Sequence, residues 1–70
     1  MRDVKQRDLL AISGGFIPIE LYCNRENGRN LWGVDIDGVN WFELENQTHA
    51  IVLYHMMKEH ITQYMHYEKL

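Results

Sequence analysis

The residues best suited to chemistry in this chain are its four histidines. His49, His55, His60 and His66 are separated by six, five and six positions, so no two of them have the i, i+4 spacing that directs two imidazoles at one metal ion. His55 and Glu59 do have that spacing, but His66 lies about 10 Å further along a helix that rises 1.5 Å per residue. The spacing predicts solvent-exposed histidines and no metal site.

Two further candidates are the single cysteine and an acidic turn. Cys23 points inward on a predicted strand, far from the histidines, which argues against an activated thiol. The segment DIDG at 35–38 resembles part of a calcium loop, but aligning Gly38 with its glycine puts Gly33 and Leu44 where oxygen ligands are needed. We find no acid/base pair in a plausible cleft. We therefore predict a protein that is not an enzyme and has no cofactor.

Composition narrows the class of protein further. Seventy residues make one small domain with a limited core, and 46% hydrophobic residues are ample for a folded chain. The net charge is −3 and the basic residues are scattered, which argues against nucleic acid as a partner. No apolar run has transmembrane length, so no membrane span is expected. One cysteine excludes an internal disulfide.

The first fifteen residues end in Ser13-Gly14-Gly15. Counting back from Gly15 as −1, apolar residues fall at −4, −7, −12 and −15 and an acid at −8; they are Ile12, Leu9, Val4, Met1 and Asp8. This segment resembles a double-glycine leader, the export tag of many bacteriocin and microcin precursors, although that family usually has Glu at −8. The resemblance implies cleavage after Gly15 and export of residues 16–70, with recognition and cleavage residues Val4, Asp8, Leu9, Ile12, Gly14 and Gly15.

The same segment also has a purely structural interpretation. Val4, Leu9 and Ile12 fall on one helical stripe and glycines follow it, which predicts a short amphipathic N-terminal helix. Such a helix can be a leader, or it can pack on the rest of the domain. Residues 1–15 are therefore either a removable segment or part of the core.

Residues 16–70 form the predicted domain. Asn27-Gly28 and Asp37-Gly38 are two-residue hairpin signals, because a type I′ turn needs positive φ at both positions. They separate predicted strands at 16–23, 31–36 and 39–44. Pairing through these turns brings Cys23 opposite Trp32 and Val34 opposite Trp41. Both turns place one apolar set on a single face: Ile17, Ile19, Leu21, Cys23, Trp32, Val34, Ile36, Val39 and Trp41.

A helix is predicted after the strands. Asn46 and Thr48 are good N-cap residues, and the helix is expected to extend to about Tyr67. Its apolar stripe should cover the Trp32/Trp41 face: Ala50, Leu53, Tyr54, Met57, Ile61, Tyr64 and Met65. The predicted fold class is α+β, a three-stranded antiparallel meander covered by one C-terminal helix, with a short N-terminal helix.

The uncovered sheet face is the predicted protein-binding surface. It combines aromatic and polar residues, with Tyr22 and Phe42 on either side of Gly33. Its candidate binding residues are Tyr22, Leu31, Phe42, Leu44, Glu20 and Asp35. The alternative is that the N-terminal helix packs there. A free edge strand, at 16–23 or 39–44, could also pair with a second copy of the chain to form a homodimer.

These observations predict a protein that functions by binding, and two classes of binding protein are consistent with them. One is an exported bacteriocin-like or microcin-like peptide, made as a precursor and cut after Gly15. The other is a cytoplasmic adaptor or inhibitor, of the kind that phages and mobile elements encode, which binds one host protein through a sheet face or edge.

Overall fold

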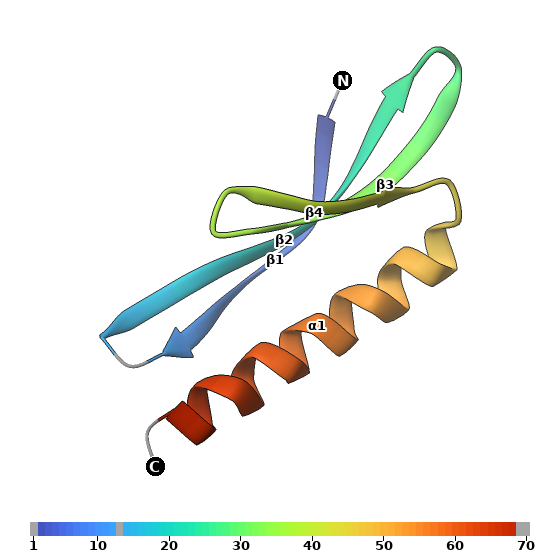
Figure 1. The fold of residues 1–70 in the computed structure, drawn as a ribbon. Helices are drawn as coiled ribbons and strands as arrows, with labels where there is room; N and C mark the ends of the chain where they lie inside the picture. Colours follow the sequence, from blue (N-terminus) through green and yellow to red (C-terminus); the bar gives the residue numbers. More distant parts are fainter. Residues whose placement is uncertain (1, 13, 69–70) are drawn as a thin grey trace.

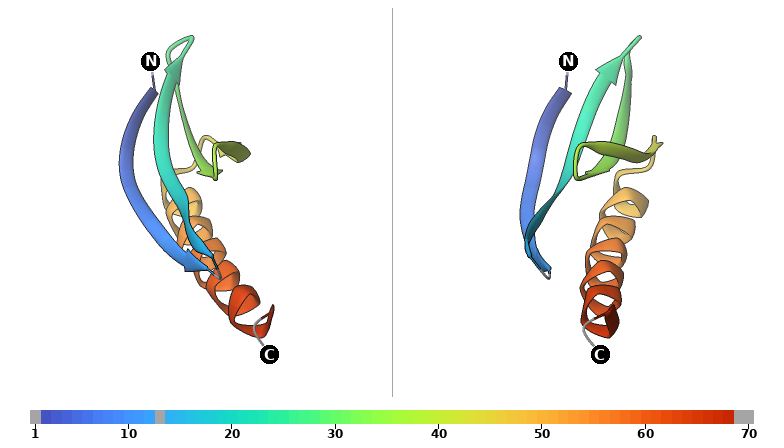
Figure 2. Two further views of the ribbon diagram at one scale, coloured as in Figure 1. Left: turned by 90° about the vertical axis from the view of Figure 1, so that its left-hand side faces the viewer. Right: turned by 60° about the vertical axis from the view of Figure 1, so that its left-hand side comes forward.

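A four-stranded antiparallel sheet and one helix make up an α+β domain (Figure 1). The computed structural model describes residues 2–12 and 14–68 and, of their side chains, those up to Thr62. In chain order the elements are β1 (Arg2–Ile12), β2 (Gly15–Glu26), β3 (Arg29–Ile36), β4 (Val39–Leu44) and α1 (Gln47–Glu68). The strands lie side by side in this order. Figure 2 shows β1 and β4 at the two margins of the sheet and α1 along one face.

The N-terminal segment is a strand, so the predicted N-terminal helix is wrong and the sheet has four strands instead of three. β1 pairs with β2 from Arg2↔Asn24 to Ile12↔Gly15. Gly14 and Gly15 have φ values of 91° and 152°, which glycine adopts without a Cβ clash, and they reverse the chain. An isolated helix of this length is unstable in water, whereas β2 offers a full hydrogen-bond ladder.

This pairing also changes which strands have a free edge. The predicted edge at 16–23 lies within β2, which has β1 on one side and β3 on the other. The free edges of the described sheet belong to β1 and β4.

Both predicted hairpin turns are confirmed. Asn27 and Gly28 have φ values of 53° and 75°, and Asp37 and Gly38 have 53° and 80°, as type I′ turns require. The predicted β2–β3 register is confirmed as well, including Cys23↔Trp32 and Ile19↔Ile36.

The predicted β3–β4 register is only half right. Val39 pairs with Ile36 as expected, but Val34 pairs with Phe42 and not with Trp41, because the register shifts between Val34 and Asp35. One extra residue in a strand sends the side chains beyond it to the opposite face. Phe42 therefore packs against the core, and Trp41 is 61% exposed.

The core lies between the sheet and α1. Asn46 caps the helix, as predicted, by accepting a hydrogen bond from the His49 N–H at 2.8 Å. The buried cluster contains Leu10, Ile19, Leu21, Val34, Ile36, Ala50 and Tyr54, and half-buried Met57 and Ile61 extend the helical stripe. Met1 and the side chains of Tyr64, Met65 and His66 lie outside the described part of the chain. Within that part, no helix combines the length and apolarity needed to cross a lipid bilayer.

Candidate protein-binding surface

The outer face of the sheet, opposite α1, is organised around Tyr22. This side chain is 2% exposed, and its ring lies across Gly33, its partner on β3. A Cβ on Gly33 would stand 2.4 Å from the Tyr22 hydroxyl oxygen and 2.6 Å from the Phe42 carbonyl oxygen. Both distances are shorter than real Cβ contacts, so glycine is required beneath the ring.

A polar network covers Tyr22 and connects all four strands. The Arg2 guanidinium lies 3.8 Å from the centre of the Tyr22 ring and forms an ion pair with Asp35. Asn40 donates hydrogen bonds to the Tyr22 hydroxyl at 2.6 Å and to Asp35 at 3.1 Å. Tyr22 in turn donates to Glu43 at 2.8 Å. Burial, and then the hydrogen bond to Glu43, raises the pKa of Tyr22 to about 12, so the hydroxyl stays protonated at neutral pH.

Three of the predicted partner-binding residues belong to this network or its margin. Tyr22 and Asp35 are buried, Asp35 at 7% exposure. Glu20 forms an ion pair with Arg7 at 3.3 Å. The structure brings these three together on the outer face, where their polar groups are already satisfied within the chain.

The apolar members of the predicted set lie elsewhere. Phe42 and Leu44 pack against the core on the α1 side, because the β4 bulge turns them away from the outer face. Leu31 is half-buried and pairs with Asn24. The predicted set therefore does not form one surface.

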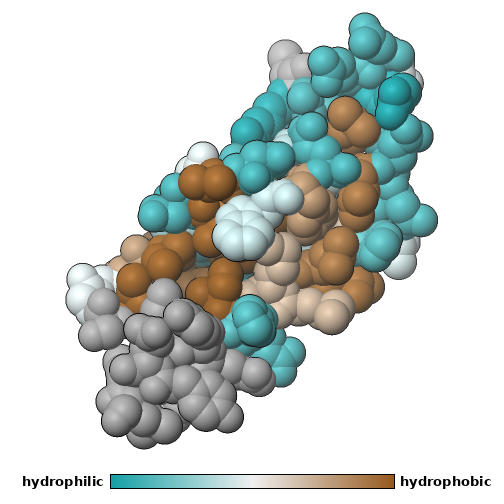
Figure 3. Space-filling model, viewed as in Figure 1, coloured by the Kyte–Doolittle hydropathy of each residue, from teal (hydrophilic) through white to brown (hydrophobic). Residues whose placement is uncertain are grey.

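β4 presents the exposed aromatic residue that the sequence placed in the core. Trp41 and Val39 are each 61% exposed. Figure 3 shows hydrophobic residues gathered in a band between the sheet and α1, in the view with β4 in front. The flanking acids Asp37, Glu43 and Glu45 are all exposed, and residues 37–45 contain no lysine or arginine, although Arg29 of β3 forms an ion pair with Glu45. These five side chains, two apolar and three acidic, are called the β4 surface below.

β1 is joined to α1 through Asp8. The fully buried Tyr54 donates a hydrogen bond to the Asp8 carboxylate, and Lys58 Nζ lies 3.4 Å from the same oxygen. The hydrogen bond from Tyr54 is the main cause of the lowered pKa of Asp8. Burial, and then the bond to Asp8, raises the pKa of Tyr54. Asp8 is therefore ionised and Tyr54 neutral over the ordinary pH range.

The residues of the leader pattern occupy different positions along β1 and its turn. Asp8 faces α1, while Val4 and Leu9 are 46% and 59% exposed and Ile12 is half-buried. Gly14 and Gly15 are exposed at the hairpin end, with no atom within 4 Å of where a Cβ would stand. The backbone at this pair of glycines is open to solvent.

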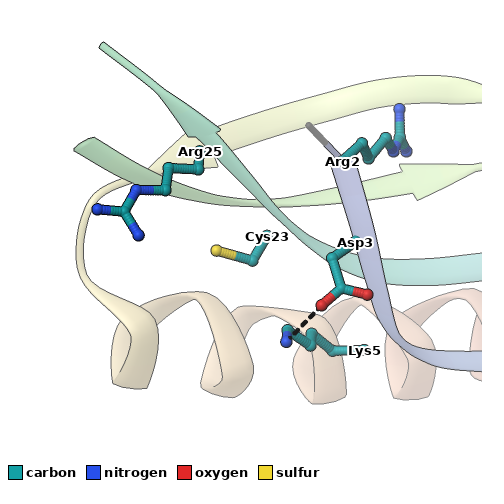
Figure 4. A pocket seen from close by; sticks show the side chains of 5 residues that line it. All are labelled: Arg2, Asp3, Lys5, Cys23 and Arg25. Atoms are coloured by element: carbon teal, nitrogen blue, oxygen red, sulfur yellow. Dashed lines mark ion pairs between the residues drawn. The ribbon is translucent and has the colours of Figure 1, made fainter. Parts of the chain in front are cut away.

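A cavity of about 310 Å³ lies near the N-terminal end of β1 (Figure 4). Its lining side chains are Arg2, Asp3, Lys5, Cys23 and Arg25. Figure 4 shows Arg2 and Cys23 pointing away from each other. Lys5 forms an ion pair with Asp3 at 2.6 Å, and Arg2 is held by Asp35. Across residues 2–12 and 14–68, no three metal-binding side chains come together.

Comparison of the chain with protein-family models, with curated proteins and with solved structures finds no match. Function is therefore inferred from the residues and contacts of this chain alone.

Sequence reasoning missed two features of the surface. The outward position of Trp41 depends on a bulge for which residues 39–44 carry no signal. The Asp8–Tyr54 hydrogen bond joins residues 46 positions apart, but one clue was available, since a tyrosine in an apolar helical stripe needs a partner for its hydroxyl.

Proposed function

We propose that this chain acts by binding another protein, not by catalysis, and that Trp41 is the centre of the contact. The observation that carries the proposal is the 61% exposure of Trp41 beside Phe42, which packs in the core. Tryptophan is enriched among the residues that dominate binding energy at interfaces. Bulges often redirect a side chain next to a functional site. An adaptor or inhibitor is the class that this arrangement favours.

The charge of the β4 surface indicates the chemistry of the partner. Asp37 and Glu43 flank the apolar pair along the chain and leave it with a net negative charge, since only the third acid, Glu45, is paired with a basic residue, Arg29. The complementary partner has an apolar pocket for the indole and a basic rim. Association should therefore slow as ionic strength rises, because salt screens charges at an exposed rim.

The test is site-specific cross-linking from the β4 surface. A photoreactive residue at position 39 should yield one protein adduct in the producing cell. Trp41→Ala should reduce that adduct at least about tenfold, the loss expected for an interface anchor. Phe16→Ala is the matched control, since Phe16 is 68% exposed but lies at the start of β2, where it pairs with β1 and not with β4. Equal losses in both variants, or none in Trp41→Ala, would contradict the proposal.

A precursor with a double-glycine leader is the second candidate. The exposed Gly14–Gly15 turn favours it, because a peptidase needs an accessible backbone and no Cβ in its slot. A double-glycine peptidase should then release a product beginning at Phe16, and Gly14→Val should block the cut. Mass spectrometry of the treated protein decides the matter. A chain that stays intact under the peptidase would remove this candidate.

A further inference from the structure

We propose that a second copy of this chain pairs with the free edge of β1, forming an antiparallel dimer with its two-fold axis at Leu9. The inference goes beyond the proposed function, because it uses the margin of the sheet opposite β4. Figure 2 shows β1 at that margin, with no other described element outside it. The partner in this contact is a strand, because the edge presents backbone groups.

The two halves of β1 differ in how well they are protected from such pairing. The first half has an irregularity between Val4 and Gln6 and a series of charged residues, both of which discourage edge pairing. Residues 9–12 are Leu, Leu, Ala and Ile, with no charge and no proline, and their pairing with β2 is regular. The second half of β1 is therefore an unprotected edge.

Pro18 shows which backbone groups of β1 face outward. Its carbonyl accepts a hydrogen bond from the Asp37 N–H at 2.8 Å, so its backbone polar group points toward β3. Leu9 is the partner of Pro18 on β1, and this pair is therefore of the non-hydrogen-bonded kind. The N–H and C=O of Leu9 consequently point to the free edge, and alternation gives Arg7 and Ala11 the same direction.

These outward groups are self-complementary in one register. With Leu9 opposite Leu9 of the second copy, each pair of facing residues can exchange two hydrogen bonds. Arg7 then faces Ala11 of the second copy, and by symmetry Ala11 of the first copy faces Arg7 of the second. Shifting the axis to Asp8 or to Arg7 would place two like charges directly opposite each other, which is destabilising. An axis at Ala11 would leave a single residue of β1 on one side, because the strand ends at Ile12. Charge, backbone direction and strand length together therefore select Leu9.

The side chains fit the same register. Leu9 is 59% exposed and Phe16, the partner of Ala11 on β2, is 68% exposed. In the dimer Arg7 of one copy lies beside Phe16 of the other, while its guanidinium is paired with Glu20 of its own chain at 3.3 Å. Asp8 faces Leu10 of the second copy, and its charge is already bound by Lys58 and Tyr54 of its own chain.

The experiment is sedimentation of the purified full chain over a concentration series reaching about 1 mM. The expected mass at the upper end is twice the 8.4 kDa of one chain. Leu9→Lys places two lysines at the axis and should weaken dimerisation at least about a hundredfold. Val52→Lys is the control, since Val52 is a 48% exposed residue on α1 and should leave the dimer intact.

A mixture of two variants makes the test specific for Leu9. Equal amounts of Leu9→Lys and Leu9→Glu should restore the dimer, because the axis then carries opposite charges. A wild-type chain that stays monomeric over the whole series would overturn the inference, as would a dimer that survives Leu9→Lys. Neither outcome affects the cross-linking test at Trp41, so the two proposals fail separately.

Discussion

The two edge strands of the sheet, β1 and β4, offer opposite kinds of contact. β4 has six residues, contains the extra residue that shifts its register, and leads directly into α1; it exposes a side chain, Trp41. β1 has eleven residues and is regular over its second half; it exposes a line of backbone groups. A short, irregular edge resists strand pairing, whereas a long, regular, uncharged one invites it. One small sheet can therefore bind an apolar pocket at one margin and a strand at the other.

The two strands are also held in place differently. β4 is held by the outer-face network, in which Asn40 and Glu43 bond to Tyr22. β1 is held by its ladder to β2, by the contacts of Arg2 with Tyr22 and Asp35, and by the Asp8–Tyr54 hydrogen bond to α1. Substitution of Tyr54 should therefore loosen β1 alone, whereas substitution of Tyr22 removes the side-chain contacts of β4 and, on β1, those of Arg2.

Tyr22→Ala should have the largest effect. It removes a ring that is 2% exposed together with the acceptor and donor that β4 uses, and we expect a loss of roughly 3–5 kcal/mol in the free energy of unfolding. Phe16→Ala, an aromatic truncation at 68% exposure, should change it by less than about 0.5 kcal/mol. Urea denaturation of both variants makes the measurement. Similar losses in the two variants would contradict the buried position of the Tyr22 ring.

Gly33→Ala should cost somewhat less, roughly 1–3 kcal/mol, as an overpacking change. The added Cβ would meet the Tyr22 ring at 2.5 Å and the Phe42 carbonyl at 2.6 Å, so the ring must move off β3. In a Tyr22→Leu background part of that clash is gone, and the two losses should sum to more than the loss in the double variant. If denaturant unfolding showed the two losses to be strictly additive, the contact between position 33 and the Tyr22 ring would be contradicted.

Tyr54→Phe should loosen β1 without affecting β4. It removes the hydrogen bond to Asp8 while keeping the buried ring, and we expect a loss of roughly 1–3 kcal/mol, the range for a bond to a charged group. Amide exchange should accelerate across β1 more than across β4. Lys58→Ala, which removes a partly exposed ion pair and a cation–π contact with Tyr54 at 5.8 Å, should cost less than about 1 kcal/mol.

The alkaline limb of stability, which appears only above pH 10, should depend on the tyrosines. Folding raises the pKa of Tyr22 from 10.0 to about 12, so above pH 10 the unfolded chain loses a proton that the folded chain keeps. The stabilisation is fully present below pH 10 and is lost as pH rises toward 12. Tyr54, whose pKa is also raised, adds to the decline. Tyr22→Phe should flatten the curve between pH 10 and 12; an unchanged slope would argue against the buried hydroxyl.

Much of this fold could be predicted from local signals. Asn27-Gly28 and Asp37-Gly38 require positive φ, and they fixed both turns and the β2–β3 register. Asn46 marked the start of the helix. These features depend on a few adjacent residues, so a single sequence is sufficient to find them.

The rest depends on contacts between distant residues. Residues 2–12 fit a helical stripe and a strand equally well, and only pairing with β2 decides between them. The register shift at Asp35 likewise depends on how Asn40 reaches Tyr22 and Asp35 across the sheet. Because of that one shift, Phe42 packs against the core and Trp41 is exposed. The candidate site therefore lies on the β4 surface and not on the outer face.

The central claim is that Phe42 packs against the core while Trp41 is exposed. The free energy of unfolding of two variants tests this claim most directly. Phe42→Ala should cost at least about 2 kcal/mol, because the ring packs against the core. Trp41→Ala should cost less than about 1 kcal/mol, because the indole is 61% exposed. The reverse order, with Trp41→Ala losing roughly 3–5 kcal/mol, would mean that β4 is unbulged and that no indole is available to a partner.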